Sequence, residues 1–281
     1  MNGTERPQQP GPQPTRGPGP AAPPGSCRDV HDGPALVTVD LGGGARGWFT
    51  TRRAPGGGDG ASRDLGFNLA LHVGDDPTAV TANRAALEDL VGGPIGWMNQ
   101  AHSATVAPAR RDGAVDADGI VLDPAVPGAP AAVGVLVADC VPVLLAATDG
   151  SRVAAVHAGR RGMLDGVVTR AVEALAAWAV RPEDLRAVIG PSVCGACYEV
   201  PEDMARQAAA VEPACHAVTR WGTPGIDVAA GVRAQLERAG VVLVEAPGWC
   251  TVEDRRFFSY RREGATGRLA GVVAPRPPVR T

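Results

Sequence analysis

The sequence predicts a single layered α/β domain, and two observations support this. Through the second half of the 281-residue chain, short apolar runs of strand length alternate with longer amphipathic segments of helical period. No Pro/Gly/Ser-rich linker and no internal repeat interrupts this order between residues 34 and 281. We therefore expect one compact domain over residues 34–281, although the length alone would allow about two domains of ~150 residues.

The expected elements follow from hydrophobic period and from Gly and Pro. A β-hairpin is predicted near the start of the domain. Apolar and polar residues alternate over 36–41, a β-rich run follows at 47–51, and a glycine run at 42–44 turns the chain between them. Pro77 at the start and Gly92 after the end predict a helix over 77–91. Further strands are expected at 133–138, 141–147, 152–156, 185–189, 241–245 and 269–273, and further helices at 162–180, 201–211 and 227–239.

The composition excludes several classes of function. All 27 basic residues are arginines, which excludes chemistry built on a lysine side chain, such as Schiff-base enzymes, pyridoxal phosphate enzymes and the P-loop. A formal net charge of −3 and an aromatic content of 4% argue against nucleic acid as a partner. No run approaches the roughly 18 apolar residues that span a bilayer, so we expect no membrane partner either.

The first 33 residues differ in composition from the rest. The first 26 carry eight Pro and five Gly and no apolar run, which predicts a disordered tail over residues 1–33 and not a signal peptide. Six cysteines spread over so long a chain do not indicate a disulfide framework. We therefore expect a cytoplasmic protein with reduced thiols.

Three metal-ligating side chains stand where apolar runs end. His102 follows a short apolar segment, Cys140 interrupts a long apolar stretch, and His157 ends a predicted strand before a helix. Imidazole nitrogen and thiolate sulfur together suit zinc or copper, and three protein ligands leave a fourth position open, as in catalytic zinc sites. Asp139 is a candidate to orient one ligand. Because the spacings match no local metal motif, hydrogen-bonded histidines and a buried small cysteine remain the alternative.

Cys194 and Cys197 form a CxxC motif after the strand expected at 185–189. A zinc ribbon needs a second such pair, which the sequence lacks. A thioredoxin-type site needs a helix after the motif, whereas residues 198–201 have the pattern of an extended segment. A redox role and a structural metal role remain open for this pair, and the sequence does not decide its role.

Two arginine pairs stand where an oxyanion can bind. Arg52 and Arg53 precede a glycine-rich loop, and Arg160 and Arg161 begin a predicted helix. Guanidinium groups and backbone N–H groups converge at such positions. These pairs are the best-placed candidates for a phosphate site.

Read in order, a set of short segments resembles the laccase-domain or polyphenol oxidoreductase family, also described as purine nucleoside phosphorylases and peptidoglycan editing factors. No single segment is decisive, but the ordered set covers roughly residues 36–274. The segments are 50–52, 68–75, 83–84, 100–102, 138–145, 155–162, 189–191, 197–200, 250–251 and 257–262.

The resemblance implies a single α/β sandwich of the laccase-domain (cytotoxic-necrotizing-factor-like hydrolase) type. It implies zinc, with copper as the alternative, held in a surface pocket by His102, Cys140 and His157. The implied reaction is phosphorolysis of adenosine, inosine, guanosine and methylthioadenosine to base and sugar 1-phosphate, with adenosine deamination in addition. The expected partners are therefore small molecules, a purine nucleoside and phosphate.

The remaining site residues are expected from the same resemblance. Arg52, Asn68 and Arg160 are expected to bind substrate, although Arg160 stands where the family more often has Trp. Cys140 and His72 are expected to be catalytic. His72, Asp75 or Asp139 would move the proton, and spacing does not decide among them.

Three other functions remain open on the sequence. The first is a copper-dependent polyphenol oxidase, since thiolate and imidazole also suit copper. The second is a metal-independent hydrolase that edits peptidoglycan precursors, with Cys140 as nucleophile and His157 as base. The third is a binding module without catalysis.

Overall fold

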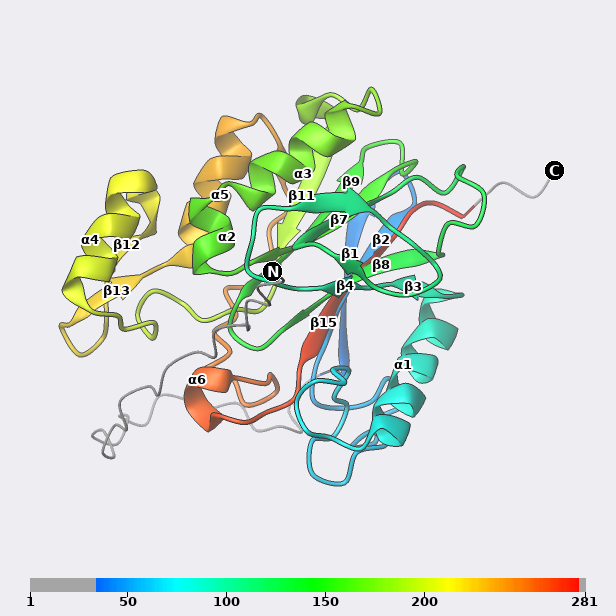
Figure 1. The fold of residues 1–281 in the computed structure, drawn as a ribbon, viewed down its shortest axis with the longest axis horizontal. Coiled ribbons are helices and arrows are strands. Elements are labelled where there is room, and N and C mark those ends of the chain that lie inside the picture. The colour runs from blue at the N-terminus through cyan, green and yellow to red at the C-terminus, as the bar shows by residue number, and fades with distance from the viewer. Residues whose placement is uncertain (1–33, 278–281) are drawn as a thin grey trace, which may run out of the picture.

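Two β-sheets lie face to face in the computed structural model, which describes residues 34–277, and helices cover both outer faces (Figure 1). The five-stranded sheet has the spatial order β1 (Leu36–Gly42), β2 (Ala45–Thr50), β15 (Leu269–Ala274), β8 (Ala132–Val137) and β3 (Ile95–Gly96). The six-stranded sheet has the order β14 (Val242–Leu243), β11 (Leu185–Ile189), β9 (Val141–Ala147), β10 (Val153–Ala158), β7 (Gly119–Leu122) and β5 (Val106–Pro108).

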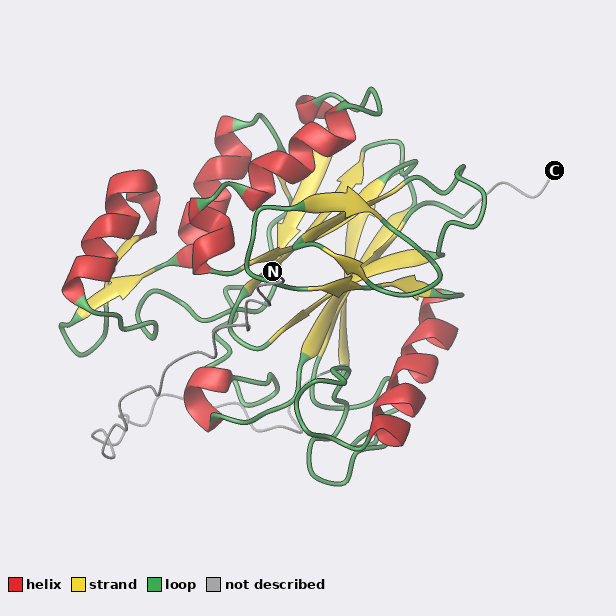
Figure 2. Cartoon of the chain, in the orientation of Figure 1, coloured by secondary structure: helices red, strands yellow, loops and turns green. Residues whose placement is uncertain are grey.

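Helices and short ladders complete the described chain (Figure 2). The helices are α1 (Pro77–Val91), α2 (Arg160–Leu164), α3 (Val167–Ala176), α4 (Glu202–Val211), α5 (Val228–Arg238) and α6 (Tyr260–Glu263), with 3-10 turns η1 (Pro182–Asp184) and η2 (Pro213–Cys215). Two further ladders pair β4 (Met98–Asn99) with β6 (Val115–Asp116), and β12 (His216–Val218) with β13 (Pro224–Ile226). Most strand neighbours are antiparallel, but β3/β8, β4/β6, β5/β7 and β11/β14 run parallel.

Alternating side chains of the strands build the layers. Along β9, Val143 and Leu145 pack in the cluster that contains α2, α3 and α5, whereas Leu144 packs between the two sheets. On the outer face of the other sheet, Leu136 packs in a cluster with Leu87 of α1. The order of layers is therefore helix, sheet, sheet, helix, as period-2 alternation between two buried faces requires. This confirms the layered α/β sandwich expected from the sequence.

Several elements that the sequence predicts have the expected bounds or pairing in the structure. Helix α1 has the expected bounds: the Asp76 side chain accepts from the backbone N–H of Thr78, and Gly92 ends the helix in the left-handed region at φ +89°. Strands β9 and β11 also have their expected bounds, and β1 and β2 form the expected antiparallel hairpin. Buried runs bounded by Gly, Pro or Asp were sufficient to place these elements.

One expected helix is wrong. Residues 162–180 form two helices, α2 and α3, because Gly166 adopts φ +81° and breaks the helical hydrogen-bond ladder. Strands β3 to β7 and helix α6 were not predicted, since elements of two to four residues carry too little periodicity. The tail expected over residues 1–33 lies outside the described residues. Among residues 34–277, no helix has the length and apolar composition needed to cross a bilayer.

Gly190, directly after β11, offers a test of the contact between the sheets. A Cβ at this position would lie 2.2 Å from Cε1 of the fully buried Phe49. Gly190→Ala is expected to lower the free energy of unfolding by about 1–3 kcal/mol through overpacking. Gly248→Ala is the matched control, because its Cβ would meet no atom within 4 Å. Chemical denaturation measures both, and equal midpoints would contradict the packing described.

Candidate metal centre

Three side chains from separate elements bring metal-binding atoms together. His102 follows β4, Cys140 lies in the connection from β8 to β9, and His157 belongs to β10. One donor atom of each lies within 4.8 Å of the other two. The Cys140 Sγ atom is 3.7 Å from His102 Nε2, and the two imidazole rings meet edge to face with centroids 4.7 Å apart. The three candidates of the sequence therefore share one site.

The buried carboxylate of Asp118 organises this site. Its Oδ1 accepts hydrogen bonds from His157 Nδ1 at 2.8 Å and from the backbone N–H of His102 at 3.0 Å. Its Oδ2 accepts from the backbone N–H groups of Ala101 and Ser103 and from the Ser103 hydroxyl. His102 adopts φ +58° within this run. Three successive N–H groups thereby converge on one anion, in the manner of a backbone nest.

The hydrogen bond to Asp118 also fixes which nitrogen of His157 is available. Because Nδ1 donates to the carboxylate, Nε2 is the atom left to bind a metal. The sequence interpretation missed Asp118, although an Asp-Gly pair before the buried run 119–122 was a visible signal. Asp139, which was expected to orient a ligand, instead accepts from the Thr251 hydroxyl and the backbone N–H of Arg261.

Charges around the site favour a thiolate. Burial opposes ionisation of Cys140, but hydrogen bonds and charge from His102 and His157 lower its pKa to about 6. Burial likewise opposes protonation of His157, but hydrogen bonds to Asp118 and Cys140 raise its pKa to about 9. Despite burial, hydrogen bonds from His157 and Ser103 hold the pKa of Asp118 well below its usual range. The thiolate form, which metals bind, is thus accessible at neutral pH.

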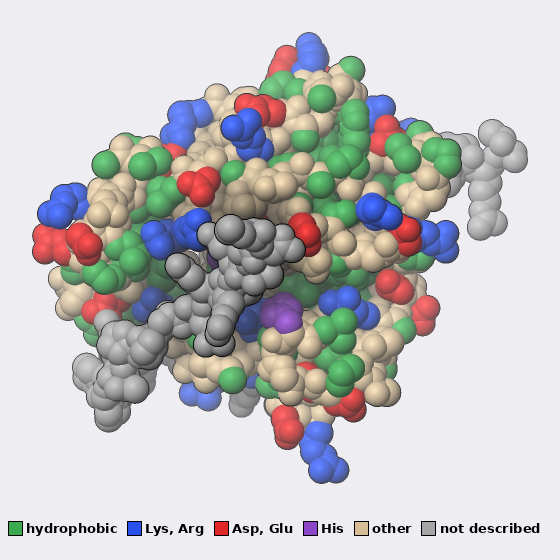
Figure 3. Space-filling view, in the orientation of Figure 1, with side chains coloured by type: hydrophobic (Ala, Val, Ile, Leu, Met, Phe, Trp, Pro, Cys, Tyr) green, Lys and Arg blue, Asp and Glu red, His purple; other side chains and the backbone are tan. Residues whose placement is uncertain are grey.

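A cavity of about 1840 Å³ opens beside the three side chains, and Figure 3 shows this face hollowed, with basic side chains along the border of the hollow. Because the chain has no lysine, these basic groups are arginines. The lining includes His72, Arg84, Trp97, His102, Cys140, His157, Arg160, Tyr198, Trp221, Tyr260, Arg261 and Arg268. Ring faces and guanidinium groups in one cavity suit a ligand that has both a flat base and an anionic group.

Two predicted substrate residues do not line the cavity. Arg52 forms an ion pair with Glu263, and its guanidinium lies over the ring of Phe258. Asn68 is buried and donates to Asp75, so both side chains stabilise loops of the fold. Asp75, an alternative proton carrier, is also engaged in this network. The contacts expected of Arg52 and Asn68 with substrate stay predictions, and the structure gives both side chains partners within the fold.

Arg160 and His72 lie at the cavity, and their contacts with substrate stay predictions. Arg160 begins α2 and makes no hydrogen bond or ion pair with another described residue that would occupy its guanidinium. Burial, together with the charges of Arg268 and Arg84, lowers the pKa of His72 from its ordinary value. Its imidazole is therefore neutral at neutral pH. Arg268 was missed by the sequence interpretation, because nothing local distinguishes it from a surface arginine.

Comparisons with known proteins agree with the fold and the motifs. The model of the family described as multi-copper polyphenol oxidoreductase laccase matches residues 46–276. A protein of Streptomyces coelicolor named purine nucleoside phosphorylase is 48% identical over 221 residues, which cover 74% of this chain and 87% of the relative. A purine nucleoside phosphorylase of Corynebacterium glutamicum is 44% identical over 233 residues, 80% of this chain and 92% of the relative.

Solved structures show the same fold. A Neisseria meningitidis protein superposes with a TM-score of 0.76 at 34% identity, covering 86% of this chain and 100% of its own. YlmD from Geobacillus stearothermophilus gives a TM-score of 0.71 at 28% identity, covering 83% of this chain and 93% of its own. Since the family model spans nearly all described residues, the resemblance predicted from the motifs is confirmed. This chain belongs to the multi-copper polyphenol oxidoreductase laccase family.

Proposed function

We propose that this protein is a zinc-dependent purine nucleoside phosphorylase, which converts a purine nucleoside and phosphate to the free base and sugar 1-phosphate. The observation that carries the proposal is the group of His102, Cys140 and His157 beside an arginine-lined cavity. The relatives named purine nucleoside phosphorylase, at 44–48% identity, support the same reaction. The substrates expected are adenosine, inosine, guanosine and methylthioadenosine.

The donor set fits a zinc ion. With Zn–S of about 2.3 Å and Zn–N of about 2.0 Å, tetrahedral coordination separates sulfur from nitrogen by about 3.5 Å. The observed distance from Cys140 Sγ to His102 Nε2 is 3.7 Å. Zinc there would supply a Lewis acid with one coordination position open to the cavity, and copper is the alternative that the same donors allow.

The arginines and His72 would carry out the rest of the reaction. Arg160 and Arg268 hold the phosphate dianion, and a phosphate oxygen attacks the anomeric carbon while the bond to the purine nitrogen breaks. Neutral His72 accepts the proton of the phosphate hydroxyl and passes it to the leaving purine. Aromatic side chains such as Tyr198 and Trp221 stack on the base. We include adenosine deamination as a second activity of the same site.

Two alternatives have specific support. The pKa of Cys140, about 6, and its contact with His157 suit a thiol hydrolase that acts on cell-wall precursors, with Cys140 as nucleophile. The family description and the soft donor set suit oxidation of phenols by copper. Phosphorolysis requires neither a thioester nor O₂, so one assay separates the three.

The assay incubates zinc-loaded protein with inosine and phosphate under anaerobic conditions. We expect hypoxanthine and ribose 1-phosphate, loss of product on chelation, and a fall of at least about 100-fold in rate for Cys140→Ala. Cys215→Ala is the matched control, because Cys215 is buried outside the cavity. Activity only with O₂ would favour the oxidase, and hydrolysis resistant to chelation but abolished by thiol alkylation would favour the hydrolase.

Asp118→Asn tests the organising carboxylate. The amide keeps the shape but loses the charge and places an N–H₂ group against backbone donors. Zinc affinity, measured by competition with a chelating dye, should fall by about 10–100-fold. The exposed Asp116→Asn should leave it unchanged. Equal affinities of the two variants would show that Asp118 does not hold the ligands.

Arg160→Ala tests the phosphate contact. Loss of one charge-assisted hydrogen bond, about 1.5–3 kcal/mol, should raise the KM for phosphate by about 10-fold or more. Arg161→Ala is the control, since Arg161 is exposed and does not line the cavity. An unchanged KM for phosphate in Arg160→Ala would assign no phosphate contact to Arg160.

A further inference from the structure

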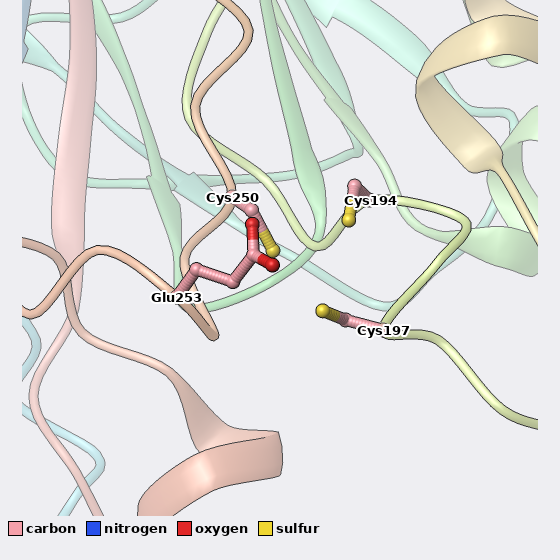
Figure 4. Close-up of side chains that lie close together, drawn as sticks. All are labelled: Cys194, Cys197, Cys250 and Glu253. Atoms are coloured by element: carbon pink, nitrogen blue, oxygen red, sulfur yellow. The ribbon is translucent and has the colours of Figure 1, made fainter. Parts of the chain in front are cut away.

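A second cluster of metal-binding side chains lies apart from the centre described above. Cys194 and Cys197, from the CxxC motif, meet Cys250 and Glu253 from a distant part of the chain. One donor atom of each lies within 4.8 Å of all the others. Figure 4 shows the three sulfur atoms pointing toward a common space, with the Glu253 carboxylate at its edge.

We propose that Cys194, Cys197 and Cys250, with Glu253 as fourth ligand, form a second, structural zinc site that fixes one wall of the cavity. Three thiolates and one carboxylate complete a four-coordinate shell, so no position is left for substrate. This distinguishes the cluster from the three-ligand centre at His102.

Two tight turns hold the four residues in place. The carbonyl of Cys194 accepts from the backbone N–H groups of Cys197 and Tyr198 at 2.9 and 3.0 Å. The carbonyl of Cys250 accepts in the same way from Glu253, at 3.1 Å, and from the following residue. Both turns therefore point a cysteine and the residue three positions later to one side, which is the spacing of zinc-binding turns.

The two turns are fixed to each other before any ion binds. Ser192 and Cys250 form a parallel β-bridge, and the Ser192 carbonyl accepts from the backbone N–H of Thr251 at 3.0 Å. Gly195 packs against Asp227, where an added Cβ would lie 2.8 Å from the Cβ of Asp227. A site held in this way loses little conformational freedom on binding a cation.

The sulfur spacing and the burial suit zinc. Tetrahedral zinc with Zn–S of about 2.3 Å separates its sulfur ligands by about 3.8 Å. In the structure the ligand atoms of the cluster all lie within 4.8 Å of one another, which is compatible with that separation. Cys197 and Cys250 are 1% and 6% exposed and form a small apolar cluster with Val193. This shell limits the access of water to the sulfur atoms.

The donor atoms of the cluster lie close enough together for one divalent ion to bind them all, since each is within 4.8 Å of the others. A divalent ion would allow all three sulfurs to ionise. Arg220 forms an ion pair with Glu253 and a hydrogen bond to Cys197, so it orients the carboxylate and offsets part of the excess negative charge of the loaded site.

The position of the cluster explains what the ion would do. Cys197, Tyr198 and Val252 line the cavity that His102 and Cys140 also line. Tyr198 in turn lies under the guanidinium of Arg261, 4.7 Å from its ring centroid. Zinc would tie the turn at 194–197 to the turn at 250–253 and so fix the aromatic wall that faces the candidate centre.

The test measures zinc bound to the full chain, purified in zinc-containing buffer, by elemental analysis. We expect about two ions per chain for the wild type and about one for both Cys140→Ala and the double variant Cys194→Ser/Cys250→Ser. Cys215→Ser, a buried cysteine in neither cluster, is the control and should keep both. A wild type with one ion, lost completely in Cys140→Ala, would overturn the proposal.

Cobalt provides a readout that does not depend on the folding of the double variant. In Cys140→Ala loaded with cobalt, we expect the strong thiolate-to-cobalt absorption of a three-thiolate site. Glu253→Cys should raise that absorption by about one third, because a fourth thiolate replaces the carboxylate. No thiolate band in Cys140→Ala, or a disulfide among Cys194, Cys197 and Cys250 after alkylation without reduction, would contradict the site.

Discussion

The buried carboxylate of Asp118 is the constraint on which the candidate metal centre depends. Burying a carboxylate without partners raises the free energy of the folded state. Here Asp118 accepts hydrogen bonds from the imidazole of His157, from three successive backbone N–H groups and from the Ser103 hydroxyl, which offset this penalty. The same bonds hold the loop that carries His102 against strand β10. Cys140 joins them because β9 and β10 are antiparallel neighbours that pair His157 with Pro142. One buried anion thus sets the positions of ligands that come from separate elements.

The parts of this protein that local sequence determines were predictable, and the parts that long-range contacts determine were not. Strand β9 and helix α1 have their expected bounds because buried runs and caps are local signals. The burial of Asp118 could not be predicted from its local sequence. It depends on contacts with residues 101–103 and with His157, and no local signal shows that these segments are neighbours. Arg52 was expected at phosphate, yet it pairs with Glu263, 211 residues away. Cys250 completes the CxxC cluster through a β-bridge that no spacing rule reveals.

The two clusters of metal-binding side chains lie beside the same cavity but differ in the number of ligands that they offer. The centre at His102, Cys140 and His157 offers three ligands and an accessible position, which suits catalysis. The cluster of three cysteines and Glu253 offers four, which suits the fixing of structure. Arginine and aromatic side chains both line this cavity. The arginines can bind an anion and the aromatic rings can stack on a base, so one surface suits both parts of a ligand. The absence of lysine in the whole sequence therefore concentrates the cationic role on arginines such as Arg160 and Arg268.

Anomalous X-ray scattering at the zinc edge, from crystals grown with zinc and soaked with phosphate, tests the central claim most directly. A peak bonded to His102 Nε2, Cys140 Sγ and His157 Nε2, with phosphate between it and Arg160, is the result predicted. His157 should still donate from Nδ1 to Asp118 in that crystal. No peak among these three atoms, or a peak there whose fourth position is filled by a protein side chain, would contradict the account.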